Sequence, residues 1–118
     1  MSPKFNEALS FLKKGNLNDA KEICLKVLND EPKNSNFLHL LGAITFEEKD
    51  YTKSEKIISE VSRLKPQAEV FHLYALILFK LKKFEHKGLE LKVVGLPFYN
   101  EKIKKKEFEK AFFNVLES

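Results

Sequence analysis

The sequence predicts an all-α fold in which about seven antiparallel helices stack as a helical solenoid. The first observation is a repeat, because Pro32 and Pro66 stand at a spacing of 34 and the apolar and small residues before them recur at the same spacing. A period of this length is typical of stacked helix pairs. The second observation is composition: the chain has 118 residues, is 43% hydrophobic, and contains no apolar run long enough to span a bilayer.

Apolar and small residues recur along the repeat. At a spacing of 34 the matched pairs are Leu17 with Tyr51, Ala20 with Ser54, Cys24 with Ile58, and Val27 with Val61. A third copy, at a spacing of 33, matches Gly42 with Ala75, Phe46 with Phe79, Tyr51 with Phe84, Ile58 with Leu91, and Val61 with Val94. Three copies are about the number at which stacking buries a continuous core.

The helices are expected at about 3–14, 18–30, 35–48, 52–64, 68–82, 85–94 and 100–117. Ser2 suits the N-cap of the first helix and Pro3 its first position. Gly15-Asn16 forms a turn after it. Pro32 and Pro66 end the second and fourth helices, because proline cannot continue the helical hydrogen-bond ladder.

The remaining helix ends rest on local signals. Asn18 is a candidate N-cap for the second helix, and Thr52 with Glu55 fits a capping box for the fourth. Gly88 lies inside the expected sixth helix and costs it roughly 1 kcal/mol relative to alanine. The last helix carries an apolar stripe of Ile103, Phe108, Ala111, Phe112, Val115 and Leu116. We expect this stripe to be buried against the third copy, as a capping helix.

The second copy contains the pair Leu41-Gly42 together with Leu38, Thr45, Ser54, Ile58 and Pro66, and it resembles the tetratricopeptide repeat family. The first copy matches that pattern at Ala8, Phe11, Ala20, Cys24 and Pro32, and the third at Phe71, Tyr74-Ala75, Leu78 and Leu91. The resemblance covers about residues 3–97. It implies a right-handed α-α superhelix, as a single domain over residues 1–118. The repeats are expected at about 1–32, 33–66 and 67–97, with the capping helix at about 100–117.

The resemblance also implies where a partner would bind, since the first helix of each pair lines a concave groove in this family. The groove residues carried over are Phe5, Leu9, Leu12, Asn36, His39, Ala43, Phe46, Glu69, His72, Leu76 and Phe79. Most are apolar, and the lysines and asparagines with which some members clamp an acidic chaperone tail are absent. We therefore expect the ligand to be an amphipathic helix or an extended hydrophobic protein segment. The same residues are also compatible with ordinary helix–helix core.

The sequence predicts a protein–protein interaction module or scaffold, and no enzyme. Cys24 falls where the repeat has a buried apolar residue, a position that suits an unreactive free cysteine. The three histidines show no metal-binding spacing, and neither a phosphate-binding loop nor a nucleophile elbow is found. We expect no catalytic residue, no metal and no cofactor. Arg63 is the only arginine, which disfavours specific recognition of nucleic acid.

Two alternatives stay open. The first is an accessory or oligomerisation domain of a larger bacterial enzyme, because similar repeats precede sulfotransferase and glycosyltransferase domains. The second, less favoured, is a nucleic-acid-binding helical repeat, for which the lysine-rich stretch 102–110 is the only electrostatic support. A homodimer is also compatible with so short a repeat array. The lone cysteine and the absence of a signal-peptide pattern predict a cytoplasmic protein without a membrane span.

Overall fold

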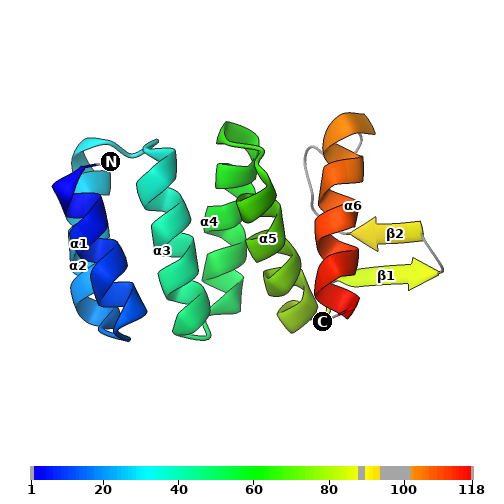
Figure 1. Cartoon of the computed structure of the whole chain (residues 1–118), viewed down its shortest axis with the longest axis horizontal. Coiled ribbons are helices and arrows are strands. Elements are labelled where there is room, and N and C mark those ends of the chain that lie inside the picture. The colour runs from blue at the N-terminus through cyan, green and yellow to red at the C-terminus, as the bar shows by residue number, and fades with distance from the viewer. Residues whose placement is uncertain (1, 88–89, 94–101, 118) are drawn as a thin grey trace. The chain divides into compact units, whose positions relative to one another are not determined.

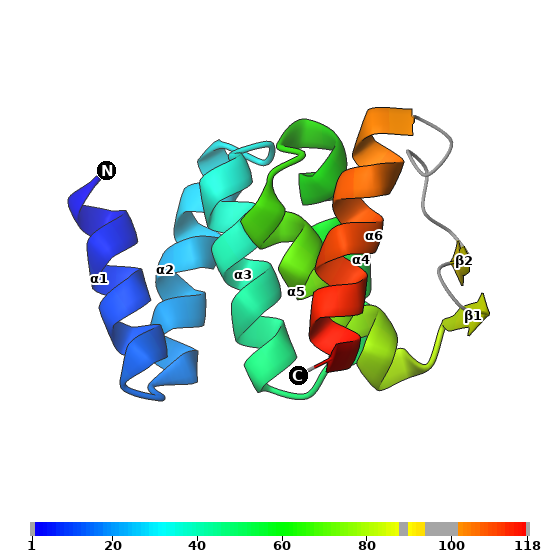
Figure 2. The ribbon, with the colours of Figure 1, turned by 45° about the vertical axis from the view of Figure 1, so that its right-hand side comes forward.

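A computed structural model describes residues 2–87, 90–93 and 102–117, which form six α-helices and one β-hairpin (Figures 1 and 2). The helices are α1 (Pro3–Lys13), α2 (Leu17–Asp30), α3 (Ser35–Glu47), α4 (Tyr51–Leu64), α5 (Ala68–Leu81) and α6 (Lys102–Glu117), and the strands are β1 (Phe84–Lys87) and β2 (Glu90–Val93). Apart from the hairpin the described residues are all-α, and helices joined by short turns pack as antiparallel pairs. The chain divides into two compact units, Met1–Ile57 and Ile58–Ser118.

The first five expected helices are confirmed to within one residue at each end, and the last is confirmed over Lys102–Glu117. Their N-terminal caps explain most of the starts. The Ser2 hydroxyl accepts the Phe5 N–H at 3.2 Å, and the Asn34 side-chain oxygen accepts the Phe37 N–H at 3.2 Å. The Asp50 carboxylate accepts the Lys53 N–H at 3.3 Å.

Two of the expected caps are wrong. Helix α2 begins at Leu17, so Asn18 lies inside the helix. Helix α4 begins at Tyr51, so the cap is Asp50, not Thr52 with its capping box. In both cases the helix begins directly after the preceding turn. Each helix therefore starts one residue before the polar residue that was expected to cap it.

The helix expected at 85–94 is wrong, because this segment contains the antiparallel hairpin β1–β2. The register sets Phe84 opposite Val93, Glu85 opposite Lys92, His86 opposite Leu91, and Lys87 opposite Glu90. The register therefore pairs positions of opposite charge in the sequence twice. The sequence also alternates apolar and polar residues over 89–93, which is the period of a strand. The expectation that Leu91 occupies a helix of the third copy is therefore also wrong, because Leu91 lies in β2. Val94, which was matched to the same helix, lies outside the described residues.

The same turn follows α1, α3 and α5. Its central residue is Gly15, Lys49 or Lys82, with φ of 80°, 65° and 56°, all in the left-handed region. The next N–H reaches back five residues in each case: Asn16 to the Phe11 carbonyl (2.8 Å), Asp50 to Thr45 (3.0 Å) and Lys83 to Leu78 (3.1 Å). The central N–H bonds the carbonyl three residues back. This is the Schellman ending of a helix, and it recurs along the chain at spacings of 34 and then 33.

The core of the first unit consists of buried side chains from α1, α2 and α3: Ala8, Ala20, Cys24, Val27, Phe37, Leu40, Leu41 and Ile44. Small residues stand at a spacing of 34: Ala8 with Gly42, and Ala20 with Ser54. All four are buried. The Ser54 hydroxyl donates to the Gly42 carbonyl at 2.8 Å, which fixes the start of α4 against α3. Small residues at these positions allow the two helices to approach closely.

The core of the second unit includes an aromatic cluster between α5 and α6. Phe108 of α6 is fully buried and packs edge-on against Phe71 (centroids 6.2 Å apart) and Tyr74 (5.9 Å) of α5. Phe112, one turn later, packs edge-on against Phe84 of β1 at 4.7 Å. The apolar stripe of the last helix is therefore buried at Phe108, Phe112 and Val115, as expected. Ala111 and Leu116 are half-buried, and the side chain of Ile103 lies outside the described part.

The left-handed turns predict opposite effects for glycine and alanine substitutions. Lys49→Gly is expected to stabilise the protein by roughly 0.5–1 kcal/mol, because glycine adopts the left-handed conformation without the Cβ penalty. Gly15→Ala is expected to lower the free energy of unfolding by about 1 kcal/mol. The loss comes from backbone strain alone, since a Cβ on Gly15 meets no atom within 4 Å. Urea denaturation measures both. Lys56→Gly, inside α4, is the matched control and should destabilise; a stabilisation there equal to that at Lys49 would contradict the account.

The aromatic contacts of α6 predict an unequal cost for two phenylalanines of the same helix. Phe108→Ala should cost about 3–5 kcal/mol, because the side chain is fully buried among rings of α5. Phe113→Ala should cost less than half of that, since Phe113 is half-buried. Thermal and urea unfolding report the difference. Equal losses would mean that α6 is not held by Phe108.

Candidate functional site

The eleven expected groove residues fall into two groups, one in each unit. Seven lie on α1 and α3 of the first unit: Phe5, Leu9, Leu12, Asn36, His39, Ala43 and Phe46. Four lie on α5 of the second unit: Glu69, His72, Leu76 and Phe79. Within the first unit α1 and α3 contact each other. The structure thus brings the seven residues of the first group onto two neighbouring helices.

All seven residues of the first group are half-buried. Phe5, Leu9 and Leu12 pack against the core of the first unit, and Phe5 meets Phe37 of α3 edge-on at 5.5 Å. These three side chains therefore hold α1 in place and still leave part of their surface accessible. We name the seven residues the α1/α3 face. Its use as a groove stays a prediction.

The α3 part of this face ends at Phe46. Its ring lies edge-on against Tyr51, the first residue of α4, with centroids 5.3 Å apart. Ala43 lies about one turn before Phe46, His39 one turn before Ala43, and Asn36 a further turn back, and all three are half-buried. The face therefore combines an aromatic end, a small residue and two polar side chains.

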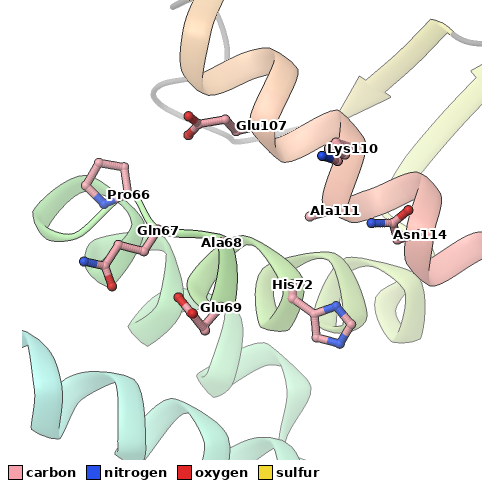
Figure 3. Close-up of a pocket in the computed structure, with 9 residues that line it drawn as sticks. All are labelled: Pro66, Gln67, Ala68, Glu69, His72, Glu107, Lys110, Ala111 and Asn114. Carbon is pink, nitrogen blue, oxygen red and sulfur yellow. The ribbon is translucent and has the colours of Figure 1, made fainter.

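In the second unit the α5 residues have different surroundings. Phe79 is 43% exposed, and its ring stacks on Phe84 of β1 with centroids 6.0 Å apart and an interplanar angle of 15°. Leu76 is half-buried. Glu69 and His72 are exposed and line a cleft between α5 and α6 (Figure 3).

This cleft has a volume of about 660 Å³. We name it the α5/α6 cleft; its lining residues are Pro66, Gln67, Ala68, Glu69, His72, Glu107, Lys110, Ala111 and Asn114. Sequence reasoning found two of these as site residues, Glu69 and His72, and missed the contribution of α6. The signal was available: residues 107, 110, 111 and 114 have the spacing of one helix face.

The polar side chains of the cleft have no partner among the described residues. Gln67, Glu69, His72, Glu107, Lys110 and Asn114 make no side-chain hydrogen bond or ion pair within residues 2–87, 90–93 and 102–117. Lys110 does not pair with Glu107, three residues earlier on the same helix. The charged groups of the cleft are therefore available to a ligand.

Cys24 is fully buried in the first unit, and burial raises the pKa of its thiol to about 11. At neutral pH the reactive thiolate is then a minor species. Among the described residues no group of three histidine, cysteine or acidic side chains is placed to hold a metal ion. None of the described helices has the length and apolar character needed to cross a membrane.

No family model matches this chain, and no curated protein matches it.

The raised pKa of Cys24 predicts a pH-dependent stability. The folded thiol ionises near pH 11 and an ordinary thiol near 9.0. Stability from the neutral thiol is therefore fully present below pH 9 and is lost between about pH 9 and pH 11, where only the unfolded chain ionises. Urea midpoints of the native protein should fall over this range more steeply than those of Cys24→Ala. Parallel pH profiles for the two proteins would refute a buried, protonated thiol.

Proposed function

We propose that the chain is a protein-binding module of the tetratricopeptide type, whose α1/α3 face binds a helical or extended hydrophobic segment of a partner. The observation that carries this proposal is the recurrence of one turn. Gly15, Lys49 and Lys82 share the left-handed conformation and the same two backbone hydrogen bonds, at spacings of 34 and 33. The three copies in the sequence are matched to one another at the same two spacings.

Burial supports the same interpretation. Cys24 and Ile58 are both fully buried, and so are Ala20 and Ser54, another pair matched by the repeat. Equivalent positions therefore have equivalent environments, as a repeat of one structural unit requires. Families built this way present their binding residues on the first helix of each pair, which here are α1 and α3 in the first unit.

The chemistry of the α1/α3 face favours a hydrophobic segment. Phe5, Leu9, Leu12 and Phe46 leave part of their apolar surface accessible, and His39 and Asn36 supply polar groups beside them. Apolar anchors with a few polar groups are the usual composition of a surface that binds an amphipathic helix. The proposal assigns the chain no catalytic role.

The proposal predicts a loss of binding from one substitution on α3. Phe46→Ser should weaken partner binding at least about tenfold, because a buried phenylalanine contributes about 1.5–3 kcal/mol to an interface. The measurement is quantitative affinity capture with the chain as bait, read by mass spectrometry. Leu25→Ser is the matched control: Leu25 is 49% exposed on α2, outside the face, and its loss should leave capture unchanged.

A second variant separates binding from folding. Ala43→Glu adds a charge to the middle of the α1/α3 face without removing a core side chain, since Ala43 is half-buried. It should abolish capture while circular dichroism stays that of the native protein. The proposed function fails if Phe46→Ser and Ala43→Glu, both folded, capture the same proteins as the native chain.

A further inference from the structure

The α5/α6 cleft exists because small residues stand where the two helices face each other. Ala68 lies at the start of α5 and Ala111 in the middle of α6, and Pro66 closes one end (Figure 3). Larger side chains would fill this space, as Phe108 and Phe112 fill the aromatic core on the neighbouring side of α6. The resulting volume of about 660 Å³ lies within the range of ligand-binding clefts, about 300–1,000 Å³.

The charges around the cleft are arranged unevenly. Glu69 of α5 and Glu107 of α6 contribute one carboxylate from each wall, whereas Lys110 contributes the only fixed positive charge among the described lining residues. The two carboxylates make no ion pair in the described part of the chain. The described lining residues thus carry one more negative than positive charge, although the whole chain has a net charge of +4. Charges more than about 10 Å away are largely screened at physiological salt, so a ligand in the cleft responds mainly to the charged side chains close to it.

Two side-chain amides complete the lining. Gln67 precedes α5, Asn114 lies two turns after Glu107 on α6, and both are exposed in the cleft. An amide carries one acceptor and two donors, which match the carbonyl and N–H of a peptide group. The floor of Ala68, Ala111 and Pro66 is apolar and suits an aliphatic stem.

We propose that the α5/α6 cleft binds an extended peptide segment through one lysine or arginine side chain. The cation lies between Glu69 and Glu107, its methylene stem covers Ala68 and Ala111, and Gln67 and Asn114 bond the flanking peptide groups. Charge-assisted hydrogen bonds to two carboxylates from different helices supply the selectivity for a cation. This inference rests on the proposed function, because it names a chemical feature of the partner, but it concerns a surface separate from the α1/α3 face.

The test is a titration of the isotope-labelled protein, followed by amide chemical shifts. The probe is a capped pentapeptide with a central arginine flanked by leucine and alanine. The comparison peptide has glutamate in place of the arginine. We expect the arginine peptide to shift amides of residues 67–72 and 106–114, and to bind at least tenfold more tightly than the glutamate peptide. Raising the salt from about 50 to about 500 mM should weaken binding several-fold.

Three variants change the cleft in different directions. Glu69→Gln combined with Glu107→Gln should weaken binding of the arginine peptide at least tenfold. Lys110→Glu, which adds a third carboxylate, should strengthen it about threefold or more. Ala111→Phe should abolish it by filling the cleft. If Ala111→Phe does not fold, Ala68→Phe tests the same space from the exposed start of α5.

The inference is overturned if the two peptides bind equally, if the shifts fall outside the cleft, or if removing both carboxylates leaves affinity unchanged. Failure here is distinguishable from failure of the proposed function. If Phe46→Ser abolishes capture and the two peptides bind equally, the proposed function of the α1/α3 face is supported and only the inference about the cleft is wrong. If the cleft binds the arginine peptide selectively but neither Phe46→Ser nor Ala43→Glu affects capture, the inference about the cleft is supported and the proposed function of the α1/α3 face is wrong.

Discussion

A helix that ends must find hydrogen-bond donors for its last carbonyl groups, and this chain meets the requirement with one backbone turn used three times. After α1, α3 and α5 a residue in the left-handed conformation lets the next N–H reach a carbonyl five residues back. After α1 and α3 the turn reverses the chain, so that the following helix returns along the helix just completed. The packing of α2 on α1 and the hydrogen bond from Ser54, at the start of α4, to Gly42 of α3 depend on this reversal. The third turn places Phe84 where its ring stacks on Phe79.

The segment after the third turn differs from the segments after the first two. A helix of 14 residues follows Gly15-Asn16 and another follows Lys49-Asp50, whereas the short strand β1 follows Lys82-Lys83. Helix α6 then supplies the rings that cover α5. Because Phe108 and Phe112 occupy one side of α6, its neighbouring side, with Glu107, Lys110 and Ala111, is left facing the start of α5. The cleft is lined by α5 and by a helix from later in the chain, which follows the hairpin.

The two surfaces therefore differ in chemistry for a structural reason. The α1/α3 face belongs to helices whose apolar residues serve the core and the surface together, so most of its residues are aromatic or aliphatic. The cleft lies beside the buried core that α5 and α6 share, and six of its nine described lining residues are polar or charged. A partner that engaged both would need an apolar segment for one and a basic side chain for the other.

Local signals in the sequence were enough to locate five helices, because prolines, caps and apolar periodicity act within a few residues. They were also enough to identify the apolar stripe of α6. They did not indicate left-handed turns at Lys49 and Lys82, since lysine has no preference for that conformation. The pairing of residues 84–87 with 90–93 as strands, and the placement of Glu107 and Lys110 across from Glu69 and His72, emerged only in three dimensions. Both depend on contacts between separate segments of the chain, and such contacts cannot be predicted from local residue propensities.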